Sequence, residues 1–232
     1  MQQESIVASF TNVRVKSLDP LAHYAIGLRF THASLRRNLR TIIRISEADH
    51  DQSDAFLDFA ALYVESLTGH HQVEDTVTFP ALARAGADVA LFETFEADHS
   101  SVHRLLDDLA RAIASTRASS PRSLQTLHRI ASDLNQALLP HLALEEETLT
   151  PENLAQMLTP AAMAAAERQA LAEHRKGGSA LLMLYIYSLS DEEQRFLFGE
   201  EAWFFRTVLV RWTWRRSFDK FLPYAFNRNL AL

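Results

Sequence analysis

The spacing of apolar residues is the feature that most restricts the fold of this chain of 232 residues. Apolar side chains recur every three or four positions over long stretches, which is typical of helices that bury one stripe. Sustained alternation of apolar and polar residues, which would indicate strands, is absent from the sequence, and no Asn-Gly or Asp-Gly hairpin turn occurs. The chain contains only 6 Gly and 7 Pro, so turns are few. The sequence therefore predicts an all-α protein built from long helices.

Helix starts are marked by a capping residue followed by proline, which is well tolerated at the first helical position. This pattern occurs at Asp19-Pro20, Ser120-Pro121, Thr150-Pro151 and Thr159-Pro160. Ser190 and Glu193 have the spacing of a capping box, and Asp88 is a further capping residue after Gly86. We expect helices over residues 20–47, 53–83, 88–117, 121–148, 160–189 and 191–222, the fifth weakened near Gly177-Gly178.

The first four helices are long enough to form a bundle, and their short connections make successive helices antiparallel. We therefore expect an up-down-up-down four-helix bundle over residues 18–150. Residues 151–232 would form a C-terminal extension of two additional helices that packs on the bundle or forms an oligomer contact.

Histidines and glutamates interrupt the apolar stripes of three successive helices. They form three pairs with a spacing of four residues, which places both members on one helical face: His70 and Glu74, His99 and His103, His141 and Glu145. An ionised glutamate in a helical core is costly unless it is paired or bound to a metal. One such pair is a weak signal, but three in order indicate a metal site inside the bundle. The chain has no cysteine, so His, Asp and Glu must supply the ligands.

The first helix contributes one more histidine to this pattern. His32 lies within an amphipathic stretch, while His23 lies nearer the start of the helix. We prefer His32 because its depth in the helix matches that of the other ligands.

This ordered set of residues resembles the hemerythrin family, in particular its HHE cation-binding branch, over about residues 20–150. The resemblance implies a non-heme di-iron centre. His32 and His70 would bind one iron, and His99, His103 and His141 would bind the other. Glu74 and Glu145 would bridge the two ions. The iron with two histidines would keep an open position, where hemerythrins bind dioxygen. Imidazole and carboxylate ligands also suit zinc and manganese, so only the resemblance points to iron.

Several neighbouring residues compete for these roles. Glu146 is the alternative to Glu145 as the bridging carboxylate. His71, four residues before Asp75, lies on a less apolar face, so we expect it outside the ligand layer or at the surface. Asp75, Asp98 and Glu96 are expected to accept hydrogen bonds from metal-bound imidazoles. The remaining histidines are expected to be solvated: His50, His128 and His174.

The C-terminal third is rich in aromatic residues with interleaved arginines. Such a segment can bind a membrane surface or single-stranded nucleic acid, but we expect it to pack on the bundle or to form a homodimer contact. The net charge of −6 argues against nucleic-acid binding. The longest apolar stretch, 180–187, is too short to span a membrane. No signal peptide is evident in residues 1–16, and the absence of cysteine suits a reducing compartment, so we expect a cytoplasmic protein.

Three functions follow from these expectations. The first is binding of dioxygen or another small diatomic ligand for sensing or storage. The second is a di-iron redox enzyme acting on nitric oxide or peroxide, with Tyr63 as a candidate proton donor. The third is an iron-dependent regulatory module whose output is the C-terminal helices. Repair of iron–sulfur clusters is disfavoured because the chain lacks cysteine. We place ligand binding ahead of catalysis, and the sequence leaves open whether the protein is an enzyme.

Overall fold

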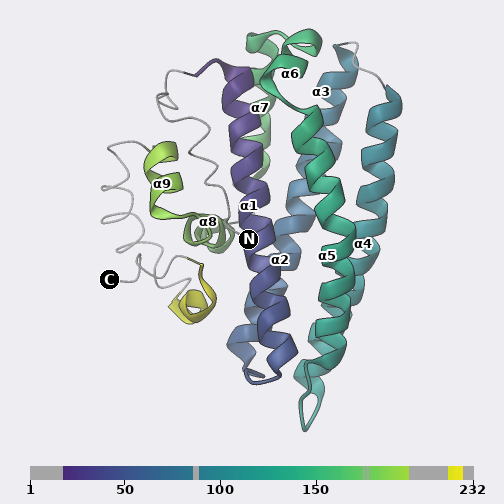
Figure 1. The fold of residues 1–232 in the computed structure, drawn as a ribbon, viewed down its shortest axis with the longest axis vertical. Coiled ribbons are helices and arrows are strands. Elements are labelled where there is room, and N and C mark those ends of the chain that lie inside the picture. The colour runs from purple at the N-terminus through teal and green to yellow at the C-terminus, as the bar shows by residue number, and fades with distance from the viewer. Residues whose placement is uncertain (1–17, 86–88, 175, 177, 199–218, 227–232) are drawn as a thin grey trace.

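The computed structural model describes residues 18–85, 89–174, 176, 178–198 and 219–226, and these ranges contain helices and turns but no strand. The predicted all-α class is confirmed. Four long helices stand side by side along the long axis (Figure 1): α1 (Pro20–Ala48), α2 (Asp54–Val73), α4 (Val89–Ala118) and α5 (Gln125–Thr148). Helices α1 and α4 each contact both α2 and α5, so the four helices enclose a common core.

The cap residues predicted for α1 hold, but the predicted start of the fourth helix is wrong. Asp19 accepts a hydrogen bond from the Leu21 amide at the start of α1. The helix expected from residue 121 begins instead at Gln125. The reason is that the preceding segment binds the α1–α2 turn: the Leu124 amide donates to Asp49 Oδ1 (2.9 Å), and Arg122 donates to the Gln52 carbonyl (2.8 Å).

The second predicted helix, 53–83, is divided into three parts. Helix α2 ends at Val73, a π-helical turn covers Glu74–Thr78, and α3 covers Phe79–Arg84. Pro80 has no amide hydrogen, and its ring would clash with the carbonyl four residues before it in a continuous α-helix. The π turn moves the chain out of that register and places Glu74 at the point of change.

The C-terminal extension contains more and shorter helices than predicted. They are α6 (Pro151–Met157), α7 (Pro160–His174), α8 (Gly178–Tyr187) and α9 (Asp191–Phe198), followed by a 3₁₀ helix, η7 (Asp219–Tyr224). The predicted helix 160–189 is broken before Gly178, whose φ of 78° does not fit a continuous helix. The capping box of Ser190 and Glu193 is confirmed by two reciprocal backbone–side-chain hydrogen bonds. Most of the predicted helix 191–222 lies outside the described residues.

The apolar core has two main parts, one toward each end of the bundle. The larger cluster includes Leu35 of α1 and Leu67 of α2, and the smaller includes Leu28 of α1 and Phe79 of α3. The His and Glu residues predicted from the sequence lie at or next to the junction between these two clusters. They belong to the four long helices and to the π turn that follows α2. The fold therefore places polar side chains from four helices at one level of the bundle, with apolar packing on both sides. No helix in the described part of the chain has the length and hydropathy that a membrane span requires.

Candidate metal centre

The first group of ligand atoms comes from α1, α2, the π turn and α5. His32 Nε2 lies 3.2 Å from His70 Nε2 and 3.4 Å from Glu145 Oε2. His70 Nε2 lies 3.4 Å from Glu74 Oε1. One ligand atom from each of these four buried residues lies within 4.8 Å of the others, a spacing that can hold one metal ion.

The second group comes from α2, α4 and α5 and consists of histidines. His99 Nε2 lies 3.0 Å from His141 Nε2, and the ring of His71 stacks on that of His99 with centroids 3.9 Å apart. One nitrogen from each of these three buried residues lies within 4.8 Å of the others. Three imidazoles that converge in this way can hold a second metal ion.

The two glutamates face both groups at once. Glu74 directs Oε1 to His70 (3.4 Å) and Oε2 to His99 (3.8 Å). Glu145 directs Oε2 to His32 (3.4 Å) and Oε1 to His141 (3.4 Å). Each carboxylate therefore directs one oxygen to the histidines of the first group and the other oxygen to the histidines of the second group. A carboxylate that bridges two metal ions has this arrangement.

Burial makes these carboxylates costly unless a cation is present. Glu74 is 2% exposed and Glu145 is 0% exposed, and none of their four oxygens accepts a hydrogen bond from the part of the chain that the structure describes. Burial raises the pKa of Glu74 well above its ordinary value, and the charges of Glu145 and Asp75 raise it further. The donor set and its lack of internal partners fit a bound metal pair.

The outward-facing nitrogens of three histidines lie near carboxylates, and two of them form hydrogen bonds with these groups. His99 Nδ1 lies 2.7 Å from Asp75 Oδ1, and His32 Nδ1 lies 3.0 Å from Glu146 Oε1. His141 Nδ1 lies 3.5 Å from Asp98 Oδ2 but forms no hydrogen bond with it. The hydrogen bonds to Asp75 and Glu146 fix the tautomers of His99 and His32 and leave their Nε2 lone pairs for a metal.

The carboxylates around the cluster also change the pKa of one of its histidines. Burial lowers the pKa of His99, but its hydrogen bond with Asp75 and the proximity of Glu145 outweigh burial and raise it to about 9. Glu146 also accepts a hydrogen bond from Arg36 (2.6 Å) and so supports His32 from outside the cluster. Asp75 accepts the hydrogen bond predicted from the sequence, Asp98 lies near His141 without a hydrogen bond, and Glu96 is exposed.

His71 and His103 occupy different positions from those expected. The surface position considered for His71 is wrong, because its side chain is 0% exposed and neither ring nitrogen has a hydrogen-bond partner among the described residues. His103 is only partly buried and stacks on His71 at 5.4 Å, with its ring 6.5 Å from that of His99. The structure therefore brings His71, and not His103, into the group with His99 and His141. The reason is that α2 packs against α1, α4, α7 and α8, so more than one of its faces is buried.

The remaining histidines lie outside the two groups. His23 is exposed and pairs with Glu167 at 2.8 Å, which agrees with the choice of His32 on the first helix. His50 is exposed, as expected, whereas His128 is half-buried with its Nδ1 near the Ile43 carbonyl. The side chain of His174 lies outside the described residues.

Sequence reasoning missed Tyr24 of α1. The hydroxyl of Tyr24 is buried and has no hydrogen-bond partner among the described residues. Burial raises its pKa well above the ordinary value, and the charges of Glu74 and Glu145 raise it further. Tyr24 lies eight residues before His32, about two helical turns, so the two side chains share a face of α1. This spacing was the sequence signal from which Tyr24 could have been placed near the candidate ligands. Tyr63, the proton donor considered from the sequence, is fully buried in the larger apolar cluster.

The fold and the site together define an all-α protein with a buried histidine–glutamate centre for metal ions. The family model of the hemerythrin HHE cation binding domain matches residues 27–152, more than half of the chain. The chain belongs to the hemerythrin family. No curated protein and no solved structure matches it. Membership in a cation-binding family and the two groups of buried ligands agree on a metal-binding protein.

Proposed function

We propose that the chain holds two iron ions in this centre and binds dioxygen or a related small diatomic ligand for sensing or storage. The observation that carries the proposal is the pair of buried carboxylates, each with one oxygen toward each group. Single-ion sites do not need two bridging carboxylates between separate sets of imidazoles. When bound, a reduced iron pair would supply electrons to an oxidising ligand, and the apolar clusters on both sides of the centre limit the access of bulk water.

We assign His32 and His70 to the first ion, and His71, His99 and His141 to the second. Glu74 and Glu145 would bridge the two ions. The two-histidine ion would have fewer protein ligands and would offer the position for an external ligand. His103, the ligand expected from the sequence, would then support His71 by stacking instead of binding metal.

Metal content tests this assignment. After anaerobic reconstitution with iron(II), the wild-type protein should bind about two irons per chain. His71→Ala should bind about one, while His103→Ala should keep two. His23→Ala, which removes an exposed histidine outside the centre, is the matched control and should also keep two. Loss of iron from His103→Ala with no loss from His71→Ala would reverse the ligand assignment, and no bound iron in the wild type would reject the centre.

Optical spectra of the loaded protein then test the ligand. A charge-transfer band that appears with dioxygen and disappears when dioxygen is removed would support reversible binding. Irreversible oxidation of the iron would reject that function and favour the second candidate, a redox enzyme acting on nitric oxide or peroxide. The buried hydroxyl of Tyr24 favours this candidate as a proton donor, because it has no hydrogen-bond partner among the described residues and lies on the face of α1 that carries His32. Tyr24→Phe would then slow turnover without changing the iron content.

A further inference from the structure

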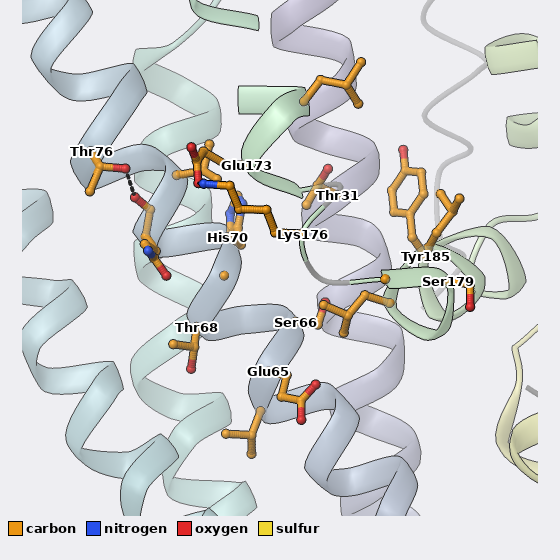
Figure 2. Close-up of a pocket in the computed structure, with 18 residues that line it drawn as sticks. Thr31, Glu65, Ser66, Thr68, His70, Thr76, Glu173, Lys176, Ser179 and Tyr185 are labelled. Carbon is orange, nitrogen blue, oxygen red and sulfur yellow. Dashed lines mark hydrogen bonds and ion pairs between the residues drawn. The ribbon is translucent and has the colours of Figure 1, made fainter. Parts of the chain in front are cut away.

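A cavity of about 1030 Å³ lies between the bundle and the C-terminal extension. One side is formed by α2, with Thr31 of α1, and the other by residues of α7 and α8 (Figure 2). In Figure 2, Glu173 and Lys176 lie near His70 at one end, while Ser179 and Tyr185 lie toward the other. The C-terminal extension therefore does not pack fully against α2, and a cavity remains between them.

The cavity reaches the metal centre through one residue. Of the histidines and glutamates in the two groups, all of which the structure describes, His70 alone lines it. His70 is also the most exposed member, at 5%, whereas His32 and Glu145 are at 0%. A molecule in the cavity would lie beside the ligand of the first ion.

The size of the cavity exceeds what a diatomic ligand requires. Pockets for organic ligands span roughly 300–1,000 Å³, so this cavity lies at the upper end of that range. Its lining is mainly apolar and includes Val64, Val73, Leu181, Leu182 and Tyr185. Such a surface binds an apolar molecular body, and the hydroxyls of Ser66, Thr68 and Ser179 can orient one or two polar groups.

The charges in the lining argue against an anionic ligand. Lys176 is the one cation among the described lining residues, and its Nζ donates to Glu173 Oε2 at 2.5 Å. Glu65, which is exposed, is the other charged residue of the lining. Among the described lining residues, two carboxylates and one lysine give no excess positive charge, which disfavours a phosphate or carboxylate, and the mainly apolar lining favours an uncharged ligand.

Gly69 keeps space open directly beside His70. It lies inside α2, where glycine costs about 1 kcal/mol of stability relative to alanine. A Cβ at this position would meet nothing within 4 Å, so packing does not require glycine here. The residue lines the cavity, and its missing side chain leaves room at the end of the cavity nearest the metal centre.

We propose that this cavity binds an uncharged, largely apolar organic molecule beside His70. The position of that molecule next to an iron rests on the proposed function, but the binding site itself does not. A suitable probe is N-phenyl-1-naphthylamine, an uncharged apolar dye that fluoresces on leaving water. It is titrated into the full-length protein, both loaded with iron and after chelation, with circular dichroism to verify that each form is folded.

Two matched pairs of variants separate the cavity from other apolar sites. Gly69→Leu fills the space beside His70, and Gly27→Leu is its control, because Gly27 is also a helical glycine with open space at Cβ but does not line the cavity. Leu182→Asp places a charge in the lining, and Leu144→Asp is its control, because both leucines are 37% exposed and Leu144 belongs to α5 outside the lining.

The expected result is saturable binding of one dye per chain. Gly69→Leu and Leu182→Asp should each weaken binding at least about tenfold, and the two controls should stay within about twofold. Equal weakening in the cavity variants and their controls, or no saturable binding by folded wild-type protein, would overturn the proposal. If the protein binds no iron but the folded chelated form still binds dye with this pattern, the proposed function fails while the cavity site stands.

Discussion

Two buried polar clusters, the metal centre and an ion pair on the other side of α1, differ in how their carboxylates are partnered. Arg37 of α1 donates from Nη1 to Glu193 Oε2 (2.6 Å) and from Nη2 to Glu193 Oε1 (2.9 Å). Its Nη1 also donates to the Ser188 carbonyl (2.8 Å), and the Ser190 amide donates to Glu193 Oε2 (2.7 Å). Both oxygens of Glu193 therefore have partners, although Arg37 Nε has no hydrogen-bond partner among the described residues.

The contrast shows how a structural carboxylate differs from one arranged for an external cation. Burial alone would raise the pKa of Glu193, but its hydrogen bonds with Arg37 and Ser190 outweigh burial and lower it. Burial raises the pKa of Glu74, and the negative charges of Glu145 and Asp75 raise it further. Both oxygens of Glu193 accept hydrogen bonds from the chain, whereas neither oxygen of Glu74 accepts one from the described residues, which leaves them available to an external cation. Four experiments test this distinction, from the largest expected effect to the smallest.

Removing the metal should have the largest effect. A ligand at a thousandfold excess over its Kd stabilises the folded state by about 4 kcal/mol per site, because it binds only the native arrangement. Urea unfolding, followed anaerobically by circular dichroism, should therefore show a much lower free energy of unfolding after chelation than with iron(II) present. Identical curves for the two forms would show that the centre does not need an external cation, and the comparison would fail.

Replacing Glu193 should weaken the fold without affecting the metal. Glu193→Met leaves Arg37 charged and buried without its partner, which should lower the free energy of unfolding by about 3 kcal/mol. Iron content should stay at the wild-type value. The control is the double variant Arg37→Met with Glu193→Met, which removes both charges and should recover part of the loss. Loss of iron from Glu193→Met would mean that the ion pair also supports the metal centre.

The same substitution at Glu74 should have the opposite effect on the metal-free protein. Glu74→Met removes a buried carboxylate that no described residue partners, so the chelated variant should be more stable than the chelated wild type by about 1–2 kcal/mol. With iron present the order should reverse, because the variant loses a bridging ligand. Urea unfolding of both proteins in both states measures this. A destabilised chelated variant would show that Glu74 has a structural role resembling that of Glu193.

The helical class and the height along the bundle of the candidate metal centre could be predicted from the sequence. Both depend on the spacing of residues within a single helix. The pairs His70/Glu74 and His141/Glu145 each share a helical face, and the structure directs both pairs into the core. The break in the second helix was missed because a proline does not always interrupt a helix: Pro80 follows a π turn, whereas α5 continues through Pro140. The late start of α5 was missed because it depends on Asp49, which is 75 residues from Leu124.

The roles of His71 and His103 show where spacing alone is insufficient. His99 and His103 are four residues apart, but the structure groups His99 with His71 of a different helix. The stacking of His71 between these two rings depends on how α2 and α4 approach each other, and a single sequence does not contain that geometry. The link between Arg37 and Glu193 was missed for the same reason, because it joins residues 156 positions apart.

The pH dependence of the ion pair gives the smallest expected effect. Folding lowers the pKa of Glu193 below its ordinary value of 4.5, so its contribution is complete above that value and is lost as the pH falls through the lowered value. Each unit of lowering contributes about 1.4 kcal/mol. The difference in free energy of unfolding between wild type and Glu193→Met should be constant from about pH 6 to 8 and should shrink below about pH 4. Both proteins carry the same metal centre, so its titration cancels in the difference. A difference that grows on acidification would show that Glu193 is stabilised as the neutral acid, and the two clusters would then be alike.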